Sequence, residues 1–389
     1  VVTAIVNELI ALDRHVVVVA DDYHLISNPD VHRCVEQLID LAPANLTVVV
    51  STRIDPPFRL GRMRVRGRIT EIRAADLQFG VDEAGWLLDA DAAGLDRSAV
   101  GRLAERTEGW AAGLVLAGLS LRDGTDVDAF VASFQGDDQL VADYLIEEFL
   151  DSLHDDERDR LLDASVLDRM SGPLVDEVCG TADGSTWLRS VAASNQLVIA
   201  LDRTGTWYRF HHLLRDVLRS ELETRSPERK ATLHAAAGRW HAAAGEPSAA
   251  IEHYLDAGLQ VEAADLVAEH ATALLNVGRT YTINRYIERL GTLVDEHEGL
   301  AIVHGWVSFV TGRFAEAERS LEIATRRDVD GVDAGLIQSL SAMIHLAKGD
   351  VASGLAVVQH QTPMTEPTHP MVLGGVRVMA GRFDEARPF

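Results

Sequence analysis

The stretch QLVIALDRTGTWYRF, residues 196–210, decides how the middle of this 389-residue chain folds. It contains two runs of strand-forming residues, 197–202 and 206–210. The tripeptide Arg203-Thr204-Gly205 separates the two runs, and a short connection that contains glycine is typical of antiparallel neighbours. The stretch therefore predicts a β-hairpin.

Helical patterns flank this hairpin on both sides. Two lie before it, at 173–179 and 184–194, and a third follows it directly. In the third helix, apolar residues recur at the spacing of one helix face, and they are Leu213, Leu214, Val217, Leu218 and Leu222. Helices, a hairpin and a further helix form the outline of a winged-helix domain, which we expect at 155–225.

The beginning of the chain shows a different pattern. Apolar strands at 16–20, 46–51 and 69–72 alternate with helices at 3–12 and 31–41. Strands that are apolar throughout and separated by helices are typical of a parallel sheet covered on both faces. We therefore predict a partial α/β domain at 1–80, followed by a helical extension of it at 81–154.

Past residue 230 the sequence repeats itself. Glycines recur every 32 to 37 residues, at Gly245, Gly278, Gly312, Gly349 and Gly381. A small residue often follows five positions later, as in Ala317 and Ala386, which we expect at contacts between helices. This period is typical of tetratricopeptide-like helix pairs stacked into a solenoid, here at 230–389. The predicted fold class is therefore mostly α.

Composition and charge narrow the possible functions. The chain has 60 acidic and 36 basic residues, a formal charge of −24, and such a surface repels the phosphates of DNA. Its two cysteines, Cys34 and Cys179, form no CxxC pattern, which fits a cytoplasmic protein without a disulfide framework. No apolar run reaches the roughly 18 residues of a membrane span. We expect neither direct DNA contact nor a membrane partner.

The first predicted strand, in VVVVADDYHLI at 16–26, runs directly into Asp21 and Asp22. An apolar strand that ends in an acidic pair is the Walker B pattern of P-loop ATPases, in which carboxylates at a strand end serve Mg²⁺ and the attacking water. The alternative is a strand that ends in a solvated turn, with Asp22 as a helix cap. Arg53, after the next strand, stands where a sensor of the γ-phosphate belongs.

Several other motifs of enzymes are absent from the sequence. It contains no HExxH, no GxSxG and no Cys/His cluster with zinc spacing. Its only lysines are Lys230 and Lys348, and neither lies in the GxxxxGK[ST] loop that cradles phosphates. The acidic pairs at 147–148 and 155–156 fit solvated surface better than a catalytic carboxylate pair.

Taken together, six segments resemble the MalT-like, LuxR-type large ATP-binding transcriptional regulators, a branch of the signal-transduction ATPases with numerous domains. In chain order they are VVVVADDYHLI, STRIDPP, ITEIRAADLQFGVDEA, TEGWAAGL, YRFHHLLRDVL and the helical repeats. The resemblance extends over essentially the whole chain. It implies an ATP switch module, a winged helix, a superhelical sensor domain and a terminal DNA-binding helix-turn-helix.

The resemblance also implies roles for individual residues. Asp21 matches the acid that holds Mg²⁺ with the nucleotide, Asp22 matches its acidic partner, and Arg53 matches the sensor arginine. Gly109 and Trp110 lie where related ATPases place a segment near the adenine, and His211 or His212 where they contact ADP phosphates. The alternatives are that Trp110 packs between helices, and that one histidine is buried in the core while the other is solvated.

The function implied is ATP-dependent regulation of transcription, in which nucleotide and inducer favour a self-associated, DNA-binding state. The inducer, a small molecule or a regulatory protein, would bind the repeats, and any ATPase activity would reset the switch. The absent Walker A loop and helix-turn-helix fit a fragment that lacks both ends of a regulator, or else a nucleotide-free paralogue. Two other functions stay open: a non-catalytic interaction scaffold, and the regulatory module of a cyclase or kinase.

Overall fold

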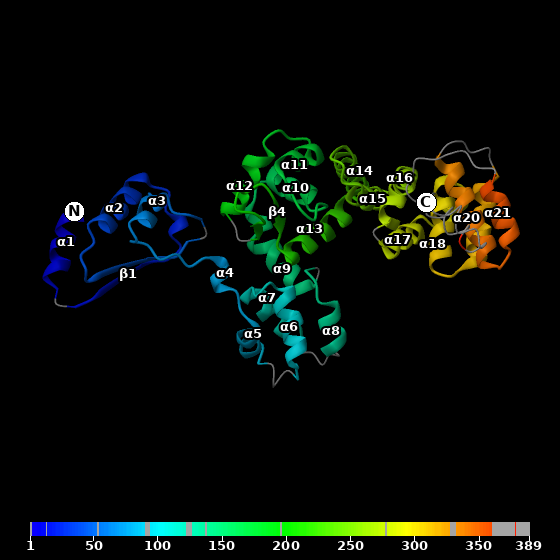
Figure 1. Cartoon of the computed structure of the whole chain (residues 1–389). Helices are drawn as coiled ribbons and strands as arrows, with labels where there is room; N and C mark the ends of the chain where they lie inside the picture. Colours follow the sequence, from blue (N-terminus) through cyan, green and yellow to red (C-terminus); the bar gives the residue numbers. More distant parts are fainter. Residues whose placement is uncertain are drawn as a thin grey trace. The chain divides into compact units, whose positions relative to one another are not determined.

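The structure is a computed structural model that describes residues 2–12, 14–52, 54–89, 94–121, 127–136, 138–194, 197–276, 278–326, 332–359 and 378. It is mostly α-helical, as predicted (Figure 1). The chain forms two compact units, 1–230 and 231–389, each of which is described by itself. No helix in the described part is long and apolar enough to cross a membrane.

The first unit begins with a small α/β segment. Its elements are α1 (Val2–Ala11), β1 (Val16–Ala20), η1 (Tyr23–Leu25), α2 (Pro29–Asp40), β2 (Leu46–Val50) and α3 (Leu60–Val65). β1 and β2 pair in parallel, from Val16 opposite Leu46 to Ala20 opposite Val50. The side chain of Asn28 accepts a hydrogen bond from the Asp30 N–H at 2.9 Å, which caps α2. The predicted strands and helices of residues 1–50 are thus confirmed to within two residues.

Two expectations for this segment are wrong. Residues 69–72 are not a strand: among the described residues their backbone does not pair with β1 or β2, and the Glu71 side chain forms ion pairs with Arg64 and Arg73. The strands are also not buried on both faces, since Val17 and Val19 are 56% and 63% exposed. In the part of the chain that the structure describes, this sheet has two strands, too few to be covered on all sides.

A group of short helices follows. They are α4 (Ala74–Leu77), α5 (Val81–Leu87), α6 (Arg97–Arg106), α7 (Ala111–Ser120), α8 (Val127–Ser133) and α9 (Gln139–Glu148), with the turn η3 (Leu150–Ser152) after them. Leu103 of α6, Leu114 of α7 and Leu145 of α9 are almost completely buried. These helices therefore share one apolar core.

The winged helix comprises α10 (Asp155–Ala164), α11 (Gly172–Cys179), α12 (Gly184–Ser194), β3 (Val198–Ala200), β4 (Tyr208–Phe210) and α13 (His212–Arg225). β3 and β4 pair antiparallel, with Val198 opposite Phe210. The Asp202 carboxylate organises the turn by accepting hydrogen bonds from the Thr206 N–H and the Thr204 hydroxyl, which lower its pKa to about 2. The hairpin and the buried face of α13 are confirmed, although both strands are shorter than predicted.

The second unit is an array of helices that come in pairs. They are α14 (Pro227–Ala243), which starts in the first unit, α15 (Pro247–Asp256), α16 (Gln260–Asn276), α17 (Thr280–Leu290), α18 (Glu298–Val310), α19 (Phe314–Ala324), α20 (Val332–Ala347) and α21 (Val351–Gln359), with η4 (Gly291–Asp295) after α17. Neighbouring pairs share apolar clusters, as in the packing of α16 and α18. This sharing of a core between neighbours is what a solenoid requires.

The repeat glycines end the first helix of each pair. Gly245, Gly278, Gly312 and Gly349 all have positive φ, between 74° and 81°. At each, the glycine N–H bonds the carbonyl three residues back and the next N–H bonds the carbonyl five residues back, as in Gly312 to Phe309 (3.0 Å) and Arg313 to Ser308 (2.7 Å). This is the Schellman geometry that favours glycine at a helix end. Gly381 and Ala386 lie outside the described residues.

Candidate functional site

The acidic pair lies at the carboxyl edge of the two-stranded sheet. The Ser51 N–H bonds the Ala20 carbonyl at 2.9 Å, and the Tyr23 N–H bonds the Ser51 carbonyl at 2.9 Å, so pairing continues past both strand ends. Asp21 and Asp22 therefore stand beside the residues that follow β2. Arg53, the predicted sensor, lies outside the described residues.

A buried tyrosine fixes this edge. Tyr23 is 1% exposed, packs on Phe58 with ring centroids 5.2 Å apart, and its hydroxyl lies 3.0 Å from Nδ1 of His32. Asp22 before it adopts a left-handed conformation (φ 47°), and its N–H bonds Oδ1 of Asp21 at 3.0 Å. The Asp22 side chain makes no capping hydrogen bond, so the structure gives no support to a capping role.

Both carboxylates of this pair are exposed and could hold a cation only with outside help. Among the described residues no group of three or more His, Cys, Asp or Glu is arranged to hold a metal ion. Mg²⁺ commonly takes one or two carboxylates and completes its shell with water and phosphate oxygens, so the pair fits a metal that arrives with a nucleotide. Lys230 pairs with Glu223 and Lys348 with Glu318, and neither lies in a GxxxxGK[ST] loop that would cradle the phosphates.

The turn between α6 and α7 is the second place where predicted site residues lie. Glu108 and Gly109 have positive φ, 50° and 68°. The Gly109 carbonyl accepts the Phe79 N–H at 2.9 Å, and a Cβ on Gly109 would lie 2.7 Å from the Phe79 carbonyl oxygen. Glycine is therefore required here both by conformation and by the close approach of another backbone.

Glu108 points from this turn to the winged helix. Its two oxygens each accept a hydrogen bond from Arg209 of β4 at 2.7 Å, and Oε1 also accepts the His212 N–H at 3.1 Å. The Glu108 side chain is 10% exposed. Burial opposes its ionisation, but the Arg209 hydrogen bonds and the positive groups around it lower its pKa to about 2. A bidentate, partly buried ion pair thus joins the helical segment to the winged helix.

His211 forms a second link at the same place. It is 5% exposed, its Nε2 lies 3.0 Å from the Thr107 carbonyl, and its Nδ1 accepts the Leu213 N–H at 3.3 Å. These partners require the tautomer that carries its proton on Nε2. Burial lowers the pKa of His211, so the ring is neutral at pH 7. The Trp110 ring meets it edge-on at 6.0 Å.

Four of the seven predicted site residues therefore lie together. They are Gly109, Trp110, His211 and His212. Trp110 also contacts Tyr144 at 5.8 Å, so helix packing accounts for part of its environment. Sequence reasoning missed the pair at the centre, Glu108 and Arg209, although both stand inside the motifs TEGWAAGL and YRFHHLLRDVL. No local signal pairs them, because they are 101 positions apart in a chain rich in charged residues.

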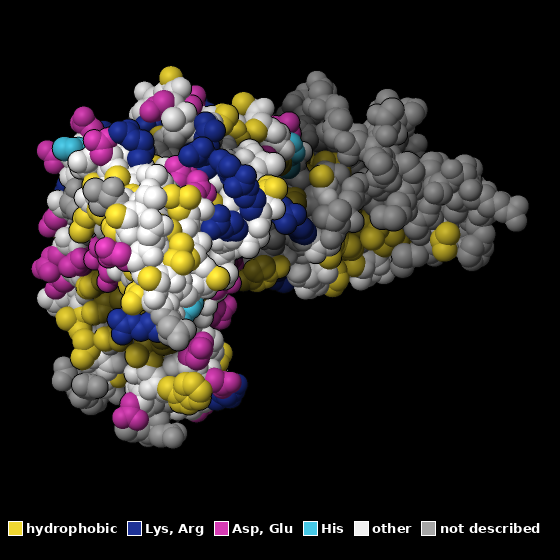
Figure 2. Space-filling view, turned by 90° about the vertical axis from the view of Figure 1, so that its left-hand side faces the viewer, with side chains coloured by type: hydrophobic (Ala, Val, Ile, Leu, Met, Phe, Trp, Pro, Cys, Tyr) yellow, Lys and Arg dark blue, Asp and Glu magenta, His cyan; other side chains and the backbone are white. Residues whose placement is uncertain are grey.

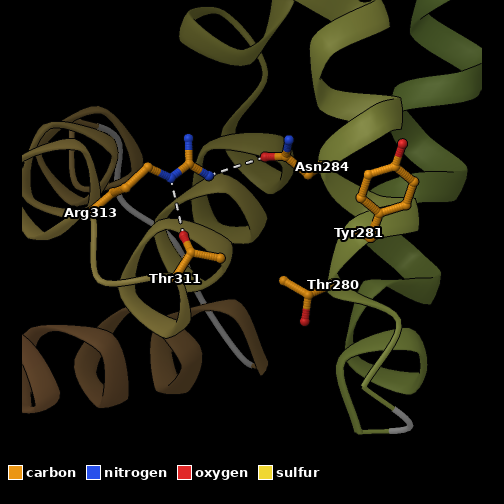
Figure 3. Close-up of a pocket in the computed structure, with 5 residues that line it drawn as sticks. All are labelled: Thr280, Tyr281, Asn284, Thr311 and Arg313. Atoms are coloured by element: carbon orange, nitrogen blue, oxygen red, sulfur yellow. Dashed lines mark hydrogen bonds between the residues drawn. The ribbon is translucent and has the colours of Figure 1, made fainter.

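A hollow of about 340 Å³ opens in the repeats, between the start of α17 and the turn after α18 (Figure 3). Arg313 spans it, donating from Nε to the Thr311 hydroxyl at 3.0 Å and from Nη2 to Oδ1 of Asn284 at 3.1 Å. Thr280 and Tyr281 complete the lining, and Tyr281 is 82% exposed. Successive repeats thus present an aromatic ring and polar groups at one opening.

Comparison with known proteins finds similar sequences. Residues 146–230 match the family described as the MalT winged helix domain. The chain is 32% identical over 323 residues to the serine/threonine-protein kinase PknK of Mycobacterium tuberculosis (strain ATCC 25618 / H37Rv), covering 82% of this chain and 29% of that protein. It is 30% identical over 321 residues to the HTH-type transcriptional regulator MalT of Yersinia enterocolitica, covering 82% of this chain and 36% of that protein.

A solved structure also aligns with 95% of this chain, at 16% identity and a TM-score of 0.45. It is a signal transduction ATPase with numerous domains from Pyrococcus horikoshii, with a tetratricopeptide repeat sensor, of which 53% is covered. The chain spans about a third of the length of the curated relatives described above. The presence of a winged helix of the MalT type and the resemblance to the MalT-like regulators are confirmed.

Proposed function

We propose that this chain is the regulatory core of an ATP-dependent signalling protein of the MalT-like kind, and that the Glu108–Arg209 junction is its switch contact. The observation that carries the proposal is the contact between the helical segment and the winged helix, in which the nearly buried Glu108 holds the partly buried Arg209 and the buried His211 bonds the Thr107 carbonyl. Such a contact can exist in two arrangements, which is what a switch needs.

The junction would respond to nucleotide through competition for its hydrogen-bond donors. Arg209 and His212 now face the Glu108 carboxylate, and a phosphate group is a stronger acceptor for the same donors. A nucleotide that took these donors would free Glu108 and weaken the hold of the helical segment on the winged helix. Bound ATP would supply the phosphates and the Mg²⁺ to which Asp21 contributes a ligand, with Asp22 beside it and Arg53 as sensor.

The two named relatives support a regulatory role for the shared segment. One is named as a transcriptional regulator and the other as a protein kinase, yet each is similar to 82% of this chain. A segment common to proteins with different outputs is best explained as the part that senses and switches. The match to PknK favours a second candidate, in which the same core regulates a kinase. The repeats, with the hollow around Arg313, would bind the inducer, and the active state would self-associate.

The test uses the full-length protein that contains this chain. Glu108→Gln removes the carboxylate that competes with phosphate for Arg209 and His212, so nucleotide should bind several-fold more tightly and self-association with ATP should need less inducer. The matched control is Glu221→Gln, which removes a carboxylate paired with Arg225 and Arg158, away from the junction, and should leave both unchanged. Nucleotide binding that is the same in wild type and Glu108→Gln, with the same oligomeric state, would contradict the proposal.

A further inference from the structure

Residues 59–73 carry a charge opposite to that of the rest of the chain. They hold six arginines and a single acidic residue, Glu71, in a protein with a formal charge of −24. The segment covers α3 and the extended residues after it. Figure 2 looks onto the side of the molecule where α1 to α3 lie in Figure 1, and Lys and Arg side chains gather over one region of that face.

Three arginines of this segment have carboxylate partners. Arg59 bonds both oxygens of Glu36 on α2, at 3.1 and 3.2 Å. Arg64 bonds both oxygens of Glu71, and Arg73 bonds Glu71 as well. These hydrogen bonds lower the pKa of Glu71 to about 2. The three arginines therefore fix the fold of the segment.

A fourth arginine serves the end of a helix. Arg68 donates to the carbonyls of Ile39 (3.0 Å) and Asp40 (3.1 Å), in the last turn of α2. A cation is favourable there because the carbonyls at a helix C-terminus are unpaired and carry partial negative charge. Arg68 is thus also accounted for by the structure of this segment.

Two arginines remain. Arg62 and Arg66 are four residues apart at the end of α3, so they project from one helix face, and both are exposed. Neither guanidinium has a hydrogen bond or ion pair in the part of the chain that the structure describes. Val65 beside them is 90% exposed. We call Arg62, Val65 and Arg66 the arginine ridge.

An acidic counterpart lies at the end of α9. Glu147 and Glu148 are exposed, and α9 has no basic residue in its last turn. Carboxylates at a helix C-terminus are repelled by the unpaired carbonyls, so these two residues cost α9 some stability. Neither has a partner among the described residues. A cationic surface from outside the chain would remove that cost.

We propose that the arginine ridge of one copy of this chain binds the acidic end of α9, Glu147 and Glu148, in a second copy. Two arginine guanidiniums match two carboxylates, and Val65 adds an apolar contact between them. The two surfaces are different, so the contact is head-to-tail and can continue from copy to copy. This names a surface for the proposed self-association, but the contact itself needs neither nucleotide nor inducer.

The test is sedimentation velocity of the 389-residue chain, at increasing concentration, in 50 and 500 mM salt. Wild type should associate in low salt and dissociate in high salt, because exposed charge pairs are screened. Arg62→Glu/Arg66→Glu should weaken association at least tenfold. The matched control, Arg33→Glu/Arg97→Glu, makes the same change of charge at arginines that are 74% and 76% exposed. It adds the same net repulsion between copies but leaves the arginine ridge intact, so it should retain most of the wild-type affinity.

An experiment that swaps the charges of the two surfaces distinguishes this contact from general repulsion between acidic chains. Glu147→Arg/Glu148→Arg alone should also associate poorly, and an equimolar mixture with Arg62→Glu/Arg66→Glu should recover association, since each then offers a complementary surface. A wild-type chain that stays monomeric in low salt would overturn the proposal, as would a mixture that does not recover. If instead duplex DNA bound wild type and not the ridge variant, the ridge would belong to nucleic acid and the proposal would be wrong. Failure here leaves the nucleotide switch standing, because that is tested by Glu108→Gln.

Discussion

At the scale of single residues, Glu108 supplies the carboxylate that joins the helical segment to the winged helix. It is a nearly buried carboxylate held by two hydrogen bonds from Arg209. Glu108→Gln keeps the shape but removes the charge, so the free energy of unfolding should fall by about 1–3 kcal/mol. Glu221→Gln, in a more exposed pair, should change it by less than about 1 kcal/mol. Chemical denaturation of both variants measures the difference, and equal small effects would mean that the pair is not a strong contact.

The same group predicts a dependence on pH. The pKa of Glu108 is about 2 in the folded chain and near 4.5 when unfolded. Its contribution is therefore complete above about pH 4.5 and is lost as the pH falls through 2. His211 has a lowered pKa, so stability is also lost below about pH 6.5, where the unfolded state takes up its proton. Wild type should lose stability in both ranges, and Glu108→Gln should show a shallower loss below pH 4.5. If the stability of wild type and of Glu108→Gln fell equally with pH below 4.5, the low pKa of Glu108 would be contradicted.

Gly109 allows a test of the backbone. Gly109→Ala would place a Cβ 2.7 Å from the Phe79 carbonyl oxygen at φ 68°, so we expect a loss of about 1–3 kcal/mol. Gly101, inside α6, is the matched control, because a Cβ there meets nothing within 4 Å. Gly101→Ala should be neutral or stabilise by up to about 1 kcal/mol. If both substitutions stabilise the chain, the turn does not have the described geometry.

At the scale of helices and strands, local signals predicted well wherever a short pattern decides the structure. The valine run gave the bounds of β1, and the spacing of leucines gave the buried face of α13. ITEI at 69–72 has the same strand-forming character, yet ion pairs of Glu71 with arginines hold it as an extended segment. Its conformation depends on partners that no local pattern reveals.

The candidate site shows the same limit. The motifs that contain Gly109 and His211 could be found in the sequence, because the segments TEGWAAGL and YRFHHLLRDVL resemble those of related ATPases. The contact of Glu108 with Arg209 could not, since the two residues are 101 positions apart and only the fold brings them together. Exposure of β1 was also missed, because burial depends on the neighbours of a strand and not on its own residues.

Helix packing in the repeats gives the next prediction. Ala317 of α19 is fully buried, and a Cβ on Gly305 of α18 would lie 3.7 Å from its carbonyl oxygen. Ala317→Leu should overpack this contact and cost about 1–3 kcal/mol. Ala315→Leu, on the exposed face of the same helix, is the control and should change stability by less than about 0.5 kcal/mol. Thermal unfolding of the two variants decides; equal melting temperatures would show that the register of the repeat is wrong.

The winged helix is expected not to read DNA. The arginines of α13 are occupied: Arg215 and Arg219 pair with Asp168, and Arg225 pairs with Glu221. Phosphate contacts require free cations on one surface. The whole chain should therefore show no salt-dependent binding to duplex DNA in an anisotropy titration at 50 mM salt. Binding that disappears in Arg215→Ala/Arg219→Ala would contradict this expectation.

At the scale of the whole molecule, the net negative charge and the absence of a GxxxxGK[ST] loop from the sequence both weaken nucleotide binding. A chain with a formal charge of −24 repels ATP at long range, and only local cations can offset this. Asp21 can act on a phosphate only through a metal, and both lysines are paired with glutamates. The arginine and histidine donors at Glu108 are already engaged by that carboxylate.

We therefore expect these 389 residues alone to bind Mg-ATP weakly or not at all. The dissociation constant should be no tighter than about 1 mM, which corresponds to a binding free energy of about 4 kcal/mol. Isothermal titration calorimetry tests this directly. Two variants locate any binding that is seen: Asp21→Asn should weaken it if the metal is held at the strand edge, and Arg209→Met if the junction donors hold the phosphates. A micromolar dissociation constant that neither variant changes would mean that nucleotide binds elsewhere, and both candidate sites would have to be abandoned.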